Sequence, residues 1–171
     1  MKEVKKDLFS SILDPEVDAI CITTNGHYTT EGLAVMGGGS AGECAKRWPE
    51  TVVRLGKCLK NFGTNTPFVI GALDNEGKYV VPKLELLKEG KYSCLIFSFP
   101  TIDNLMEGAK LPLIKKSAEE LVKLVNRFGL RNVIVPRPGC GIGSLLYKDV
   151  KPILEAVFDD RFTIVSFDHE E

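Results

Sequence analysis

Two apolar strands, each leading through a glycine-rich loop into a helix, constrain the fold of this chain more than any other feature. Residues 18–24, DAICITT, are mostly β-branched or small, which is typical of a strand buried on both faces. The loop after them contains Gly37-Gly38-Gly39-Ser40. Residues 132–135, NVIV, lead likewise into Gly139-Cys140-Gly141-Ile142-Gly143. Strands that alternate with helices in this way predict an α/β fold with a mixed, largely parallel sheet covered on both faces.

The rest of the chain fits the same alternation. Turn residues at 74–77, DNEG, predict a hairpin. Pro100 is expected to end the apolar strand 92–99. Gly63 and Gly129 are expected to close two of the helices. The expected helices are 41–48, 50–61, 112–128 and 148–158, and the further strands are 67–72, 78–81, 92–99 and 161–167. The segment 64–90 has mixed polarity, and no role follows from its sequence.

Size and charge favour a single domain over residues 1–171, with a formal net charge of −1. This near-neutral charge gives no basis for sequence-independent binding to nucleic acid or to a membrane surface. The start, MKEVKKDLFS, lacks the apolar core of a signal peptide. No apolar run approaches the roughly 20 residues of a membrane helix, so we expect a cytoplasmic protein. We also expect a monomer.

Cysteine and histidine usage gives no indication of a metal site. The five cysteines are scattered without a C-x-x-C pair, which favours reduced thiols in a reducing compartment. His27 and His169 are the only histidines, and neither lies at ligand spacing from a cysteine. We therefore expect neither a metal nor another cofactor.

The two glycine-rich loops are the candidate binding site. Glycine lets the backbone approach a ligand, and a helix N-terminus behind it offers unpaired N–H donors, so a diphosphate is the expected guest. In open sheets of this kind, ligands bind beyond the carboxyl ends of the strands. The sequence has no G-x-x-x-x-G-K-[ST] motif, and its first glycine run lacks Rossmann spacing. The alternative is that both loops are ordinary flexible turns.

The motifs around these loops resemble the macro-domain family, which includes enzymes that process ADP-ribose 1''-phosphate. DAICITTN with MGGGSAGECAKRWPE is similar to the first family signature, and PRPGCGIGSLLYKDVKPILEAVF is similar to the second. KKDLFSS and FSFPT resemble further landmarks, so the resemblance covers nearly the whole chain. It implies a three-layer α/β/α fold and a cleft that binds ADP-ribose or a derivative, including ADP-ribosyl groups on macromolecules.

The resemblance also implies roles for individual residues. Asp7, followed by Leu8, matches the acid that accepts the adenine amino group, and Asn25 matches the residue that contacts the distal ribose. Gly37, Gly38 and Gly39, with Ala41, match the loop beside that ribose, and Gly139, Cys140, Gly141, Ile142 and Gly143 match the loop around the diphosphate. Phe167 matches the aromatic residue that stacks on adenine. The alternatives are a solvated Asp7, a turn-forming Asn25 and a Phe167 that packs in the core.

Departures from the family patterns bear on catalysis. The first asparagine of the signature strand is Ile22, and a common hydrolase aspartate is replaced by Ala41, with Glu43 as the nearest acid. A second hydrolase branch uses a lysine and an aspartate where this chain has Ile102 and Gly143.

His27 with Asn25 is the remaining catalytic candidate, and Asp103 is a conceivable partner acid. The alternative for His27 is an exposed loop histidine. A binding module without turnover is the preferred hypothesis. A phosphatase acting on ADP-ribose 1''-phosphate or an ADP-ribosyl hydrolase is the second hypothesis, and an interaction domain with a decayed pocket is the third.

Overall fold

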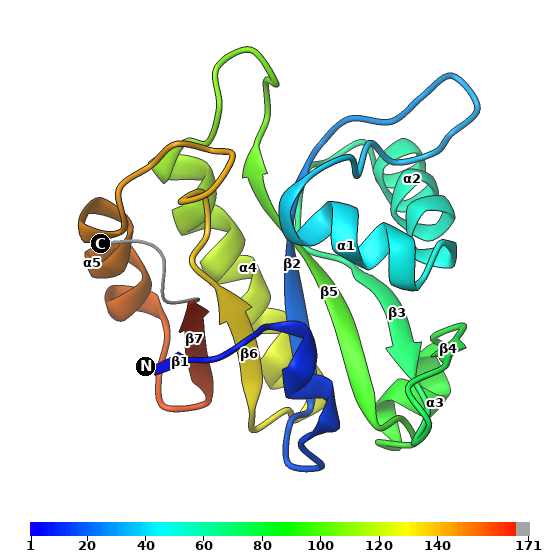
Figure 1. Cartoon of the computed structure of the whole chain (residues 1–171). Coiled ribbons are helices and arrows are strands. Elements are labelled where there is room, and N and C mark those ends of the chain that lie inside the picture. The colour runs from blue at the N-terminus through cyan, green and yellow to red at the C-terminus, as the bar shows by residue number, and fades with distance from the viewer. Residues whose placement is uncertain (167–171) are drawn as a thin grey trace.

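A seven-stranded mixed sheet forms the centre of the molecule (Figure 1), as seen in a computed structural model that describes residues 1–166. The strand order is β1-β7-β6-β2-β5-β3-β4. Every neighbouring pair from β1 to β5 is parallel, whereas β3 is antiparallel to both β5 and β4. The strands are β1 (Lys2–Lys5), β2 (Ala19–Asn25), β3 (Val69–Leu73), β4 (Tyr79–Val80), β5 (Cys94–Ile102), β6 (Val133–Pro136) and β7 (Phe162–Ser166). The predicted mixed, largely parallel sheet is confirmed.

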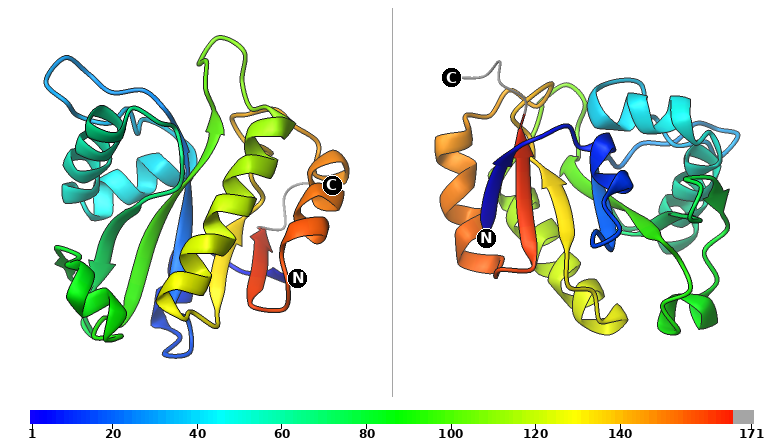
Figure 2. Two further views of the ribbon diagram at one scale, coloured as in Figure 1. Left: turned by 180° about the vertical axis from the view of Figure 1, so that it is seen from behind. Right: turned by 60° about the horizontal axis from the view of Figure 1, so that its bottom comes forward.

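Helices cover both faces of the sheet, which gives three layers (Figure 2). The helices are α1 (Gly39–Arg47), α2 (Glu50–Phe62), α3 (Leu84–Lys88), α4 (Leu111–Phe128) and α5 (Tyr147–Val157), with a short 3-10 helix at Phe9–Leu13. One buried cluster joins α1, α2 and the 3-10 helix to the sheet, and a second joins α4 and α5 to the opposite face. The predicted α/β/α layering is confirmed as well.

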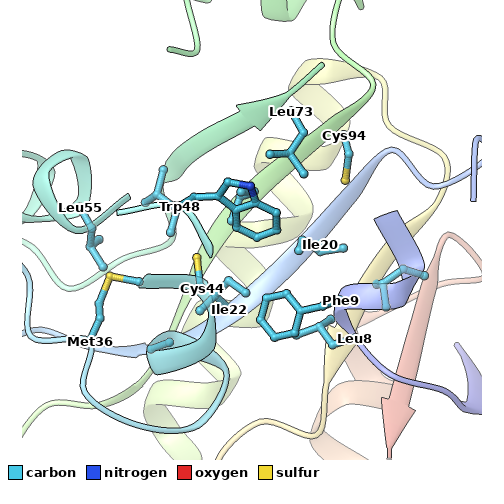
Figure 3. Packing of buried hydrophobic residues seen from close by; sticks show 14 of the residues in the cluster. Leu8, Phe9, Ile20, Ile22, Met36, Cys44, Trp48, Leu55, Leu73 and Cys94 are labelled. Carbon is cyan, nitrogen blue, oxygen red and sulfur yellow. The ribbon is translucent and has the colours of Figure 1, made fainter. Parts of the chain in front are cut away.

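Strand β2 lies at the centre of the sheet because its side chains suit both faces. Ile20 and Ile22 pack toward α1 and α2, where Phe9 and Trp48 complete the cluster (Figure 3). Ala19 and Cys21 belong to the cluster under α4. Burying a side chain of isoleucine size contributes about 1.5–3 kcal/mol. The apolar run that stands out in the sequence is therefore the strand that both helix layers share.

The largest error in the expected elements concerns Pro100. Strand β5 does not end there but continues to Ile102, and Pro100 pairs in register with Thr24. A proline is tolerated in a strand where its missing N–H is not required by the neighbour. The register shifts between Thr24 and Asn25, and the Pro100 carbonyl accepts a hydrogen bond from Ser117 Oγ at 2.7 Å.

The helix ends follow the glycine rule. Gly63 closes α2 with φ 66°, and Gly129 closes α4 with φ 64°. Neither β1 nor α3 is predicted from the sequence. All four residues of β1 are exposed, so this strand lacks the apolar alternation that would mark it.

Candidate functional site

Two adjoining cavities lie at the carboxyl ends of the parallel strands, where the loops after β2, β5 and β6 meet. One, of about 560 Å³, is called here the Asp7 cavity, and the other, of about 390 Å³, the Asn25 cavity. Both are lined by the same five residues at their junction: Gly39, Ser40, Pro136, Arg137 and Gly141. The two cavities therefore form one cleft that runs across the sheet edge between the glycine-rich loops.

The Asp7 cavity is a mainly apolar slot with a carboxylate at its wall. Leu8, Phe9 and Val165 line it and are buried. The Asp7 carboxylate accepts hydrogen bonds from the backbone N–H groups of Phe9 at 3.4 Å and Ser10 at 3.1 Å. A carboxylate has about four acceptor positions, so Asp7 can still accept from a ligand. The fold therefore places the Asp7 carboxylate beside an apolar wall, a combination that suits an amino-substituted base.

A charged pair borders the same cavity. The Arg47 guanidinium lies 4.8 Å from the centroid of the Phe9 ring, and its Nε donates to Glu43 at 3.0 Å. Both residues come from α1 and line the Asp7 cavity. Glu43, the acid nearest to the first glycine loop, therefore belongs to this half of the cleft and is already paired.

Asn25 holds the loop after β2 while it lines the other cavity. Its Nδ2 donates to the Val35 carbonyl at 3.1 Å, and its Oδ1 accepts from the backbone N–H of His27 at 3.0 Å. One N–H and one lone pair of the amide are left for a ligand. The turn-forming interpretation of Asn25 thus matches the geometry, and the residue also lines the Asn25 cavity.

Some glycine residues of the two loops leave no room for a side chain. A Cβ on Gly38 would lie 2.5 Å from Ile142 Cδ1, which reaches across from the second loop. A Cβ on Gly143 would lie 2.5 Å from Ala109 Cβ and 2.7 Å from the Gly139 carbonyl oxygen. The two loops therefore touch each other at the Asn25 cavity through Gly38 and Ile142, and Gly143 packs tightly against Ala109 and its own loop.

The N-terminus of α1 opens onto this junction. Its N-cap, Gly38, provides no side-chain hydrogen bond, so the first N–H groups of the helix are unpaired within it. Ser40 fixes the helix start to β2, because its Oγ accepts from Thr23 N at 3.0 Å. Unpaired N–H groups at a helix N-terminus favour an anion such as phosphate. The junction has the geometry of an anion site between two apolar-walled cavities.

Arg137 is the site residue that the sequence analysis did not single out. It lines both cavities, and its guanidinium lies 4.2 Å from the centroid of the Tyr147 ring. Tyr147 in turn donates a hydrogen bond from Oη to the Glu3 carboxylate on β1. The only sequence signal was its place in PRPGCG, directly before the second glycine loop.

His27 does not line the cleft. Its Nε2 lies 2.7 Å from the Asp103 carbonyl oxygen, and the residue lines neither cavity. The Asp103 carboxylate accepts a hydrogen bond from Asn65 Nδ2 at 2.8 Å. The structure therefore brings His27 and Asp103 together but does not bring either into the cleft.

The remaining expected residues fall as follows. Gly37, Gly38, Ala41, Ile102, Ile142 and Gly143 line the Asn25 cavity, and Cys140 lines the Asp7 cavity. Phe167 lies outside the described residues. Among residues 1–166, the lining of the Asn25 cavity includes Arg137 but no carboxylate, histidine or lysine.

No group of three or more potential ligands in the described part of the chain is arranged to hold a metal ion. All five cysteines carry thiols rather than disulfides. Burial raises the pKa of the Cys44 thiol to about 11 and that of Cys94 to about 12. These two buried thiols are therefore protonated and unreactive at neutral pH. No helix within residues 1–166 has the length and apolar character needed to cross a membrane.

Comparison with known proteins was informative at the level of structure. No family model matches the sequence, and no curated protein matches it. The macrodomain of Mycobacterium tuberculosis DarG is similar over 96% of this chain and 95% of that chain, with 24% identity and a TM-score of 0.70.

Two further structures are similar over almost the whole chain. Thermosipho africanus DarTG in complex with ADP-ribose has a TM-score of 0.74 and 18% identity, over 99% of this chain and 42% of that one. The macrodomain of Thermus aquaticus DarG has a TM-score of 0.68 and 20% identity, over 98% and 97%. The similarity therefore covers nearly the whole chain and shows a macrodomain fold.

Proposed function

From the macrodomain fold of this chain, we propose that it binds ADP-ribose, or an ADP-ribosyl group on a modified macromolecule, in the cleft between its glycine-rich loops. The observation that carries the proposal is the order of features along the cleft. An apolar slot with the Asp7 carboxylate comes first, the junction at the N-terminus of α1 next, and the cavity that holds the Asn25 amide last. Adenine, diphosphate and distal ribose follow one another in the same order.

The chemistry of each part supports this assignment. Asp7 accepts from the exocyclic amino group of adenine and has no donor for a guanine-type carbonyl. The N-terminus of α1 and the loop 139–143 surround the diphosphate with backbone N–H groups. The volumes of the two cavities, about 560 and 390 Å³, suit a ligand of this size.

Calorimetry with ADP-ribose tests the proposal. Heat of binding and a rise in melting temperature are expected, and the absence of both at millimolar ligand would exclude it. Asp7→Asn should weaken the affinity about 10- to 100-fold, since a hydrogen bond to a charged acceptor is worth about 1.5–3 kcal/mol. Asp14→Asn is the matched control, because Asp14 also accepts from a nearby backbone N–H but lines neither cavity.

Turnover is the second candidate function. One observation favours turnover: Asn25 lines the cavity and accepts a hydrogen bond from the His27 backbone. A movement of this loop would therefore shift Asn25 and His27 together. The lining of the Asn25 cavity supports binding without turnover, since it offers Ile102, Ala41 and Gly143 where hydrolases carry a lysine or acids. Incubation with ADP-ribose 1''-phosphate measures phosphate release directly. Release that is unchanged in His27→Ala would exclude the histidine mechanism.

An interaction domain that no longer uses its cleft is the third reading. Its test is Gly141→Glu, which places a carboxylate at the junction of the cavities. Under the proposed function this variant repels the diphosphate and loses ADP-ribose binding. If binding is retained, the ligand does not occupy the junction.

A further inference from the structure

Five residues line both halves of the cleft, and Arg137 is the one among them whose side chain carries a charge. The others are two glycines, a serine and a proline. Lys6 and Arg47 line the Asp7 cavity but not the Asn25 cavity, and Arg47 is paired with Glu43 at 3.0 Å. The position at which a diphosphate passes between the halves therefore has a single positive side chain beside it within the described residues.

The orientation of Arg137 leaves its donors available. The guanidinium carbon lies over the Tyr147 ring, 4.2 Å from its centroid. The five N–H donors of a guanidinium lie in its plane, and stacking does not consume them. Within residues 1–166, no carboxylate lies at salt-bridge distance from Arg137. Among the described residues, Arg137 therefore packs on an aromatic ring and forms no salt bridge.

Tyr147 is itself fixed from the edge of the sheet. Its Oη donates to Glu3, and the same carboxylate accepts from Lys151 Nζ at 2.8 Å. The hydrogen bonds from Lys151 and from Tyr147 hold the pKa of the Glu3 carboxyl below its ordinary value. Burial, together with the hydrogen bond to Glu3, raises the pKa of Tyr147, so the ring stays neutral. Strand β1 and helix α5 therefore hold the ring on which Arg137 rests.

We infer that Arg137 is the side chain that binds the diphosphate of the ligand, and that Tyr147 is a positioning residue for it. Backbone N–H groups surround a diphosphate with neutral dipoles, whereas a guanidinium adds charge-assisted, bidentate hydrogen bonds. Arginine is always protonated at physiological pH, so the contribution is constant there. The inference rests on the proposed function, because it needs a diphosphate at the junction.

The test is the affinity for ADP-ribose and its dependence on salt, measured by calorimetry at low and high NaCl. Arg137→Gln should weaken binding about 10- to 100-fold at low salt, as expected for loss of a hydrogen bond between charged groups. The salt dependence should also become shallower, because one screened contact is gone. Arg137→Lys keeps the charge and loses the planar fork, so the affinity should fall less and the salt dependence should remain.

Two variants of Tyr147 separate positioning from direct contact. Tyr147→Phe keeps the ring and should bind within a factor of about two of the wild type. Tyr147→Leu removes the ring and should lose about two- to fivefold in affinity, which corresponds to a partly exposed cation–π contact. Lys148→Gln is the control for the charge change, because Lys148 is exposed and lines neither cavity.

The outcomes distinguish this inference from the proposed function. If the wild type binds no ADP-ribose, the proposed function fails, and the role of Arg137 fails with it. If the wild type binds and Arg137→Gln binds equally well, only the inference is overturned. Weaker binding of Arg137→Gln with an unchanged salt dependence would also overturn the inference. That result would mean that Arg137 supports the shape of the cleft and does not contact the charged diphosphate. If Arg137→Gln does not fold, as judged from its melting curve, Arg137→Lys decides by the same two readouts.

Discussion

Thr24 has a buried hydroxyl whose removal should stabilise the protein. The residue lies near the end of β2, is only 5% exposed, and its Oγ1 finds no hydrogen-bond partner among residues 1–166. A buried hydroxyl without a partner costs about 1–3 kcal/mol of folding free energy. Thr24→Val replaces that hydroxyl by a methyl group and keeps the β-branched shape. The free energy of unfolding should therefore rise by about 1–3 kcal/mol.

Thr51→Val is the matched control, since Thr51 is equally buried but its hydroxyl is satisfied. Its Oγ1 donates to the Trp48 carbonyl at 2.7 Å, so the same substitution should lower the free energy of unfolding by about 0.5–1.5 kcal/mol. Urea unfolding gives both values. In thermal melts, each kcal/mol should appear as a shift of about 2–4 °C for a domain of this size. If both variants shift stability in the same direction, the burial argument for Thr24 is wrong.

Three further results are expected. Gly143→Ala should destabilise the protein by about 1–3 kcal/mol, because its Cβ would lie 2.5 Å from Ala109 Cβ. Gly141→Ala has no neighbour within 4 Å of its Cβ and should change the stability by less than about 0.5 kcal/mol. Urea unfolding compares the two variants. The pKa of Glu3 is lowered on folding, so the stability that this carboxylate contributes is present above its ordinary pKa of 4.5 and is lost as the pH falls through the lower folded value. The difference in melting temperature between wild type and Glu3→Gln should accordingly be constant near pH 7 and shrink below about pH 4.5. His27→Ala should leave the affinity for ADP-ribose unchanged in calorimetry, since the imidazole contacts the Asp103 carbonyl and not the cleft.

The central strands and the glycine loops could be predicted because their signals are local. Strand β2 is buried on both sides, so its apolar run is continuous, and Gly63 and Gly129 end helices by their own backbone conformation. The apolar run and the helix-ending glycines can both be recognised in the sequence without knowing which elements pack against each other.

What could not be predicted depends on partners that are distant in sequence. Strand β1 consists of exposed residues and exists because it pairs with β7, more than 150 residues later, at Lys2 with Thr163. Arg137 is one of 22 lysines and arginines, and it stands out only through its place in both cavities and its contact with Tyr147. The position of His27 could not be predicted either, because its ring contacts the Asp103 carbonyl, 76 residues later in the chain.

The two edges of the sheet also determine how another molecule can approach. On one side lies β1, with Lys2, Glu3 and Lys5 along an exposed strand, and on the other lies β4, which is only two residues long. Charged or very short edge strands discourage a second chain from extending the sheet. Recognition by strand addition is therefore disfavoured, so under the proposed function a macromolecule that carries an ADP-ribosyl group would approach over the loops at the mouth of the cleft. The same edges disfavour open-ended assembly of copies by strand pairing.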